Sequence, residues 1–187
     1  MKKSILLAGV ACVLIATNAS AGMREMIDHT KYYVGADYAF SKFDFKGDLD
    51  RAKDSYSSGI LNVGARMDRI GVELFGQMSG SRTQDLTDDK LKTKVYAYGM
   101  DIYGYQPLGC EGKYDLLASI GLANYHYKGE TSVSEKSANR IGYRFGLGAM
   151  YNFNDNISAR LMARYAYIGA DSMNHAAELT AGMRYNF

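Results

Sequence analysis

The chain has 187 residues, and its 22 Lys and Arg nearly balance 20 Asp and Glu, which leaves a formal net charge of +2. No basic stripe interrupts that balance, so the composition argues against nucleic acid as a partner. Beyond the first residues no stretch is long and apolar enough for a membrane helix. A mature protein that enters a membrane must therefore do so as a closed β-barrel.

The first predicted element is an export signal. A basic start, Lys2 and Lys3, precedes a short apolar run and an A-x-A cleavage pattern at residues 19–21. The apolar run is too short for an uncleaved anchor, which needs roughly 20 residues. We predict a signal peptide over residues 1–21, a short periplasmic N-terminal tail over 22–31 and a barrel over 32–187.

The chain has two cysteines, and Cys12 lies in the predicted signal peptide, which is removed on export. A lipidation site at Cys12 is the weaker alternative, since the apolar run continues past it. Cys110 is then the single thiol of the mature protein, and no intramolecular disulfide is expected.

Eight later segments alternate apolar residues with small or polar ones, which is the period of a β-strand with two different faces. They cover residues 33–40, 61–67, 70–78, 96–102, 114–123, 141–153, 157–167 and 179–187. The clearest segment runs from Ile141 to Phe153, where every second residue is apolar. The pattern predicts an all-β fold, an eight-stranded antiparallel up-and-down barrel.

The connections between these segments alternate in length. Tight turns at Asp68-Arg69 and residues 154–156, and a moderate one at 106–113, alternate with connections that are mostly long and polar. The long ones are residues 41–58, 79–93 and 127–139, whereas 169–174 is short. Such alternation is typical of outer-membrane barrels, whose short turns lie in the periplasm. A soluble barrel of the lipocalin kind is the alternative. The composition of the polar faces distinguishes the two kinds of barrel.

The polar faces of the predicted strands contain no lysine, although soluble barrel surfaces are normally rich in lysine and glutamate. Their charged members are five acids and five arginines: Asp37, Arg66, Glu73, Asp101, Asp115, Arg144, Arg160, Arg164, Glu178 and Arg184. This balanced set suits an enclosed lumen, because the planar fork of arginine pairs bidentately with carboxylates. The apolar faces keep charges out of mid-strand, where Arg or Lys would cost about 2–4 kcal/mol at the bilayer midplane. We therefore predict a transmembrane barrel with the charges inside.

Tyrosines near strand ends support the same interpretation. The apolar faces place Tyr96, Tyr114, Tyr151, Tyr167 and Tyr185 there. An apolar ring with a hydroxyl tip fits the lipid–water boundary, so these residues predict an aromatic girdle.

The chain ends on the segment LTAGMRYNF, whose apolar residues are Leu179, Ala181, Met183, Tyr185 and Phe187. This ending resembles the small eight-stranded outer-membrane proteins of the OmpA, OmpX and opacity type, and the resemblance covers nearly all of residues 33–187. It implies that the barrel-assembly machinery recognises the last strand during biogenesis. It also implies a monomer in the outer membrane of a Gram-negative cell, in contact with lipid and lipopolysaccharide. No surface ligand is identified.

A lipid A or phospholipid-modifying enzyme would need a serine beside a histidine base. His126 is the candidate base, with Ser132, Ser134 and Glu135 in the adjoining connection. The lipid A deacylases carry a His-x-Ser pair, and His126-Tyr127-Lys128 lacks the serine. We therefore predict no enzyme activity and no cofactor, with the lipid-modifying enzyme as a second alternative.

Three acids in the first long connection, Asp48, Asp50 and Asp54, do not follow the spacing of a calcium loop, so no metal site is expected. Eight strands leave an interior just wide enough for side chains. We therefore expect a structural or surface-interaction role with a filled lumen, and a narrow porin-like channel for small solutes is the first alternative. A selectivity ring or proton path is the functional alternative for the lumen charges.

Overall fold

The computed structural model describes residues 30–45, 55–80, 82–86, 89–109, 112–131, 134–170 and 173–187. Within them the chain forms the strands β1 (Thr30–Phe45), β2 (Ser55–Met67), β3 (Ile70–Ser79), β4 (Arg82–Leu86), β5 (Asp89–Leu108), β6 (Tyr114–Thr131), β7 (Ser134–Asn152), β8 (Ile157–Ala170) and β9 (Met173–Asn186). The predicted signal peptide lies outside these residues, as do Cys12, Cys110 and the acids Asp48, Asp50 and Asp54. β1 begins at Thr30, two residues before the predicted start of the barrel.

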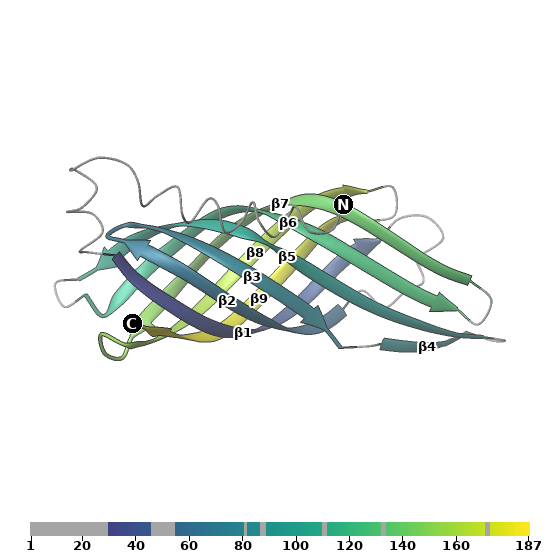
Figure 1. The fold of residues 1–187 in the computed structure, drawn as a ribbon, viewed down its shortest axis with the longest axis horizontal. Helices are drawn as coiled ribbons and strands as arrows, with labels where there is room; N and C mark the ends of the chain where they lie inside the picture. Colours follow the sequence, from purple (N-terminus) through teal and green to yellow (C-terminus); the bar gives the residue numbers. More distant parts are fainter. Residues whose placement is uncertain are drawn as a thin grey trace. The chain divides into compact units, whose positions relative to one another are not determined.

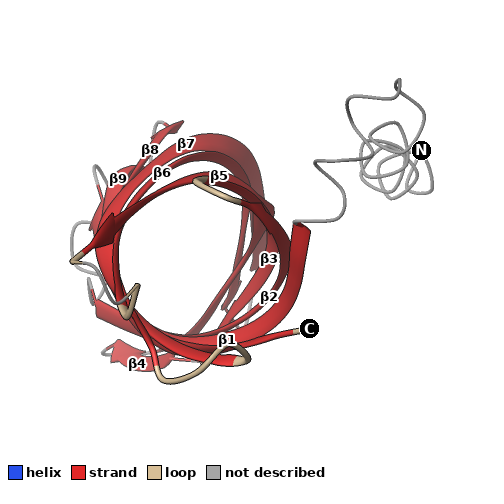
Figure 2. Cartoon of the chain, turned by 90° about the vertical axis from the view of Figure 1, so that its left-hand side faces the viewer, coloured by secondary structure: helices blue, strands red, loops and turns tan. Residues whose placement is uncertain are grey.

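The strands close into one antiparallel barrel. Their order is β3-β2-β1-β9-β8-β7-β6-β5-β4, and β3 also pairs with β5, which completes the ring (Figures 1 and 2). β3 and β4 both pair with β5 and follow one another along the chain, so together they occupy one strand position. The described residues therefore form an eight-stranded barrel, and the predicted fold is confirmed.

The last strand closes the barrel against the first. β1 and β9 pair along their lengths, with Val34 opposite Tyr185 and Phe40 opposite Leu179. The backbone N–H of Phe187 donates to the carbonyl of Tyr32 at 2.8 Å. The terminal phenylalanine is thus held by the first strand, because a closed barrel leaves no free sheet edge at this seam.

Alternation along the strands separates an outer apolar face from an inner face. Large apolar side chains on the outer face are exposed, for example Leu61 at 73 %, Leu147 at 69 % and Ile141 at 67 %. The intervening residues are buried inside the barrel, and they include most of the charged ones. This arrangement inverts the polarity of a soluble barrel and matches the sequence interpretation.

Three short turns lie at one end of the barrel, which we call the turn end. Asp68 has a φ of 51° in the turn between β2 and β3, and Gly109 (77°) and Gly112 (63°) adopt positive φ between β5 and β6. Asn154 Oδ1 accepts hydrogen bonds from the backbone N–H groups of Asn156 (3.0 Å) and Ile157 (2.7 Å). An asparagine in this role stabilises the turn that returns the chain into β8.

Three neighbouring strands continue beyond the opposite end of the barrel, which we call the extended end. β5, β6 and β7 have 20, 18 and 19 residues, whereas β8 and β9 have 14 each. β4 pairs with the beginning of β5, so the projecting part is a four-stranded sheet (Figure 1). Much of the predicted long connections at 79–93 and 127–139 is therefore strand. Their residues are mostly polar in sequence, so no regular apolar alternation marks them as strands.

In the part of the chain that the structure describes, no helix combines the length and hydropathy of a membrane span.

Candidate functional site

The lumen gathers the charged residues that the sequence placed on the polar faces. Eight of the ten are buried, with exposures of 5 % or less: Asp37, Glu73, Asp101, Asp115, Arg144, Arg160, Arg164 and Arg184. The side chains of Arg66 and Glu178 are 24 % and 11 % exposed. Their contacts fall into three groups along the barrel, which we call the turn layer, the central layer and the outer layer.

The turn layer lies closest to the turn end and contains Arg66 and Asp115. Arg66 donates to both carboxylate oxygens of Asp115, with Nη1 at 3.0 Å and Nη2 at 3.2 Å. Asn152 Nδ2 donates to the same carboxylate at 3.0 Å. The Arg66 guanidinium also stacks 4.1 Å from the centre of the Tyr105 ring. This bidentate, stacked arrangement uses arginine in a way that lysine cannot.

The central layer is built on Arg160, which joins two carboxylates. Its Nε lies 2.7 Å from Asp37 Oδ1, and its Nη2 donates to Asp37 Oδ2. The same guanidinium reaches Glu73, with Nη1 2.8 Å from Oε2 and Nη2 3.0 Å from Oε1. Arg184 Nη2 donates to Glu73 Oε2 at 2.7 Å. Charged hydrogen bonds therefore tie β1, β3, β8 and β9 together across the lumen.

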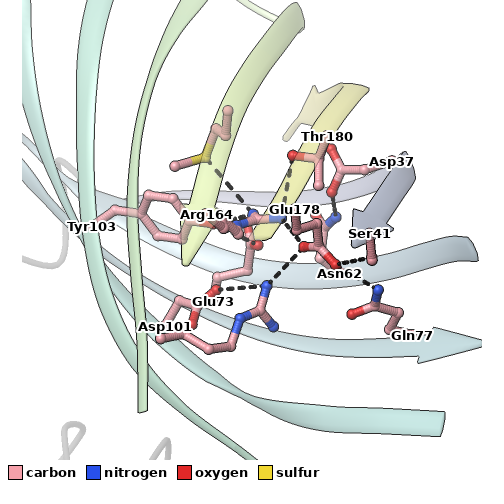
Figure 3. A network of polar contacts seen from close by, with 12 residues as sticks. Asp37, Ser41, Asn62, Glu73, Gln77, Asp101, Tyr103, Arg164, Glu178 and Thr180 are labelled. Atoms are coloured by element: carbon pink, nitrogen blue, oxygen red, sulfur yellow. Dashed lines mark hydrogen bonds and ion pairs between the residues drawn. The ribbon is translucent and has the colours of Figure 1, made fainter. Parts of the chain in front are cut away.

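The outer layer lies inside the lumen, between the central layer and the extended end, and is centred on Glu178 (Figure 3). Gln77 Nε2 and Ser41 Oγ donate to Glu178 Oε2 at 2.7 and 2.9 Å. Arg144 and Arg164 approach Glu178 Oε1 at 3.4 and 3.5 Å, and Arg144 lies 3.9 Å from Asp101. The ion pairs of this layer are longer than those of the central layer, so they hold their partners less tightly.

Each layer carries no net charge. One arginine faces one acid in the turn layer, while Arg160 and Arg184 face Asp37 and Glu73 in the central layer. In the outer layer Arg144 and Arg164 face Asp101 and Glu178. Removing one partner of such a buried pair would strand a charge, which costs about 3–5 kcal/mol. Among the described residues the formal charges therefore cancel within each layer, and these layers contain no ring of one sign of the kind that selects ions.

Three tyrosines complete the central layer, and the sequence analysis did not assign them to the lumen. Tyr33 and Tyr103 donate their hydroxyl groups to Glu73 at 3.0 and 3.2 Å. Tyr105 accepts a hydrogen bond from Arg184 Nη1 at 3.0 Å. Their spacing along the strands could have revealed them, because residues an even number apart share one face. Tyr33 lies four residues before Asp37, and Tyr103 lies two residues after Asp101.

Glycines on the inner face provide the room for these large side chains. A Cβ at Gly64 would lie 2.5 Å from the Tyr33 hydroxyl oxygen, and one at Gly71 would lie 2.9 Å from Cε2 of Tyr105. A Cβ at Gly182 would collide with the Asp37 carboxylate. The central layer therefore fits because the facing positions lack side chains.

Apolar side chains fill the lumen beyond the outer layer. Buried residues form one cluster that reaches the extended end: Ala39, Tyr56, Ile60, Phe75, Val95, Ala97, Ala123, Tyr125, Ala166, Ile168 and Ala176. Beside this cluster lies a cavity of about 10 Å³, lined by residues that include Ser41, Ser58 and Gln77. That volume accommodates about one water molecule. The buried side chains of this cluster therefore pack together inside this part of the lumen.

The histidines and acids of the described residues bear on the possibility of a metal site. No three His, Cys, Asp or Glu side chains lie close enough there to hold a metal ion. His126 lies on β6 opposite Tyr96 and Asn139. Ser132 and the side chains of Ser134 and Glu135 lie outside what the structure describes.

The residues of the predicted assembly segment lie on β9 and directly after it. Leu179, Met183, Tyr185 and Phe187 are exposed on the outer face. The rings of Tyr185 and Phe187 meet edge to face, with centroids 5.3 Å apart. Among the predicted girdle tyrosines, Tyr114 and Tyr151 contact each other at 5.0 Å near the turn end. Both ring pairs lie near that end of the barrel.

Comparisons with known proteins agree with this geometry. The sequence-family model for the outer membrane protein beta-barrel domain matches residues 6–187. No curated protein sequence matches the chain. Among solved structures, Neisserial surface protein A has a TM-score of 0.67 at 20 % identity, covering 83 % of this chain and 97 % of that one.

Two further solved structures share the fold. Ail, the attachment invasion locus protein of Yersinia pestis, solved with the heparin analogue sucrose octasulfate, has a TM-score of 0.62 at 15 % identity, covering 85 % of this chain and 99 % of that one. The outer membrane protein OprG of Pseudomonas aeruginosa has a TM-score of 0.56 at 18 % identity, covering 85 % and 96 %. At these identities the likeness shows the fold alone.

Proposed function

The chain belongs to the outer membrane protein beta-barrel domain family, and on that basis we propose that it acts at the cell surface through the projecting strands of its barrel. It resides in the outer membrane of a Gram-negative cell. Barrels of this kind keep their short turns in the periplasm and longer segments outside. The turn end is accordingly periplasmic, and the extended end faces the exterior.

The length of β5, β6 and β7 is the observation that carries this proposal. A transmembrane β-strand needs about 9–11 residues to cross the bilayer. β5 has 20 residues, so roughly half of it exceeds what a crossing requires. A sheet that the barrel holds outside the membrane presents its residues to the exterior, which suits recognition of a partner.

The filled lumen supports a surface role over transport. Neutral layers of paired charges lie across the barrel, and apolar side chains pack beyond them. A narrow channel would need an open, polar path, and no observation here favours one. Ail, which shares the barrel fold, is named the attachment invasion locus protein of Yersinia pestis. Our proposal for this chain shares only one feature with that name, namely contact at the cell surface.

A trimmed barrel tests the proposal. Ser79, the last residue of β3, lies opposite Val95 within β5, because Met78 pairs with Tyr96. Tyr127 of β6 likewise pairs with Ala138 of β7. Replacing residues 80–94 and 128–137 each by Asn-Gly should leave two-residue hairpins and an intact lumen. Cells that produce the full-length protein should bind to heparin-coated or serum-protein-coated surfaces more than cells without it, and the trimmed variant should not.

Folding of the trimmed variant is checked by the mobility difference between boiled and unboiled samples on a gel. Equal attachment by trimmed and full-length proteins would place the contact outside the projecting sheet. Failure of the full-length protein to promote any attachment would contradict the proposed function.

A further inference from the structure

Two shallow grooves indent the outer face of the described barrel near its turn end. The first groove has a volume of about 600 Å³, and Ala36 of β1 lies on its floor between the side chains of Leu61 and Met183. The second groove has a volume of about 300 Å³, and its floor contains Ala149 and Ala159. Small side chains at these outward-facing positions leave hollows between their larger neighbours.

One side chain separates the two grooves. Ala159 of β8 pairs with Met183 of β9, and Met183 pairs in turn with Ala36 of β1. Neighbouring strands lie about 4.8 Å apart, so the two alanines lie about 10 Å apart across the wall. Met183 is 55 % exposed and stands between them. The outer face therefore carries two parallel hollows with a single ridge.

Both grooves lie at the depth of the acyl chains on the periplasmic side of the bilayer. Tyr185 borders the first groove, and Tyr114 and Tyr151 border the second. Tyrosine hydroxyl groups favour the boundary between lipid and water. The two residues from Tyr185 to Met183 advance about 5 Å along the bilayer normal when a strand is tilted by about 45°. Half of the hydrocarbon core is about 15 Å thick, so Met183 lies just beneath the headgroups.

We propose that the two grooves bind the two acyl chains of one phospholipid of the periplasmic leaflet, with Met183 between the chains. The grooves are continuous with the exposed apolar face of the barrel, which this family places against lipid. An apolar hollow with a few polar groups at one end suits such a ligand. The tyrosine hydroxyl groups at the turn end can donate to the ester or phosphate oxygens of the lipid.

This phospholipid fits the grooves better than other membrane lipids. Lipopolysaccharide lies in the outer leaflet, on the side of the extended end, whereas Tyr185, Tyr114 and Tyr151 place the grooves on the opposite side. A lipid with one chain would fill only one of the grooves. The inference concerns the membrane-facing wall, so it does not depend on any contact made by the projecting strands.

Native mass spectrometry of the full-length protein in detergent tests the proposal. The probe is palmitoyl-oleoyl phosphatidylethanolamine, and its single-chain control is palmitoyl lysophosphatidylethanolamine. One diacyl molecule should stay bound per barrel. Retention of the lysolipid should be roughly tenfold lower, because linking two chains in one molecule makes the second contact intramolecular. Equal retention of both lipids, or displacement of the phospholipid by an equimolar amount of lipid A, would overturn the inference.

Three variants locate the bound lipid. Ala36→Phe and Ala159→Phe each fill one groove from the lipid side, and each should lower retention of the diacyl lipid by roughly tenfold. Ala163→Phe is the matched control, because Ala163 also faces outward on β8 and lies outside the residues that line either groove. Leucine replaces phenylalanine in any variant that loses the gel mobility shift of a folded barrel.

The variants also identify the outcomes that contradict the proposal. Equal retention by all three variants would show that the lipid does not occupy the grooves. A loss in only one of the two groove variants would leave a site for a single chain, which would overturn the two-chain arrangement. A protein dimer that disappears with the same two substitutions would assign the grooves to a second copy of the chain.

Discussion

Arg160 and Glu73 form a doubly hydrogen-bonded pair across the lumen, with Nη1 2.8 Å from Oε2 and Nη2 3.0 Å from Oε1. Their side chains are 0 % and 1 % exposed, so neither charge is hydrated by bulk solvent. The pair connects β8 to β3, and Asp37 on β1 shares the same guanidinium. These contacts fix the spacing of strands that are not neighbours in the barrel wall, which gives the filled lumen a defined geometry.

Breaking this central pair should destabilise the barrel strongly. Arg160→Met removes the charge that Asp37 and Glu73 share, at a cost of about 3–5 kcal/mol where burial is complete. Arg66→Met is the matched control. The Arg66 side chain is 24 % exposed, so this variant should lose less of the free energy of unfolding. Urea unfolding from lipid vesicles, followed by tyrosine fluorescence, measures both. Equal losses in the two variants would contradict a buried central layer.

Adding a methyl group beneath Tyr33 should also destabilise the lumen. The Gly64→Ala side chain would lie against the Tyr33 ring and displace its hydroxyl from Glu73. Gly76→Ala is the control, since a Cβ there meets no atom within 4 Å. The unfolding midpoint should fall for Gly64→Ala and stay constant or rise slightly for Gly76→Ala. A neutral Gly64→Ala would show that the Tyr33 contact is dispensable.

The last strand should be required for assembly. Replacing Tyr185 and Phe187 by serine removes outer-face apolar area at the seam with β1 and the terminal ring pair. Less folded protein should then reach the outer membrane, as measured by fractionation and gel mobility before and after boiling. Phe153→Ser is the control, because Phe153 is an exposed aromatic that lies outside the pairing of β1 with β9. Undiminished folding of the double variant would refute the assembly role.

The histidine on β6 should have no chemical role. His126→Ala should leave lipid A acylation and phospholipid turnover unchanged, because the sequence lacks the His-x-Ser pair of the lipid A deacylases. Mass spectrometry of lipid extracted from cells with and without the protein provides the measurement. An acyl-chain difference that depends on His126 would establish the enzyme instead.

The sequence was sufficient to predict the barrel wall, because lipid on one side and a packed lumen on the other impose alternation. Leu61, Ile141 and Leu147 show it directly. The projecting parts of β5, β6 and β7 were missed, since strands with water on both sides need no apolar face. The interruption between Ser79 and Arg82 likewise has no hydropathy signal.

The sequence predicted which charged residues lie in the lumen better than it predicted which of them contact one another. Alternation placed Arg160 and Glu73 on inner faces, but it could not tell which acid each arginine would contact, because that depends on strand register around a closed barrel. Tyr33 and Tyr103 were not assigned to the lumen, because tyrosine also occurs on lipid-facing surfaces near the membrane interface. Neither the three neutral layers nor the apolar cluster near Tyr125 could be read from spacing alone.

Electrical conductance in planar lipid bilayers tests the central claim, a filled lumen, most directly. The purified full-length protein should show no steady conductance, because paired charges and apolar side chains occupy the barrel. Replacing Arg144 and Arg164 together by alanine should loosen the outer layer and give intermittent openings with lower thermal stability. Large, stable, ohmic channels in the unmodified protein would contradict the account and establish a pore.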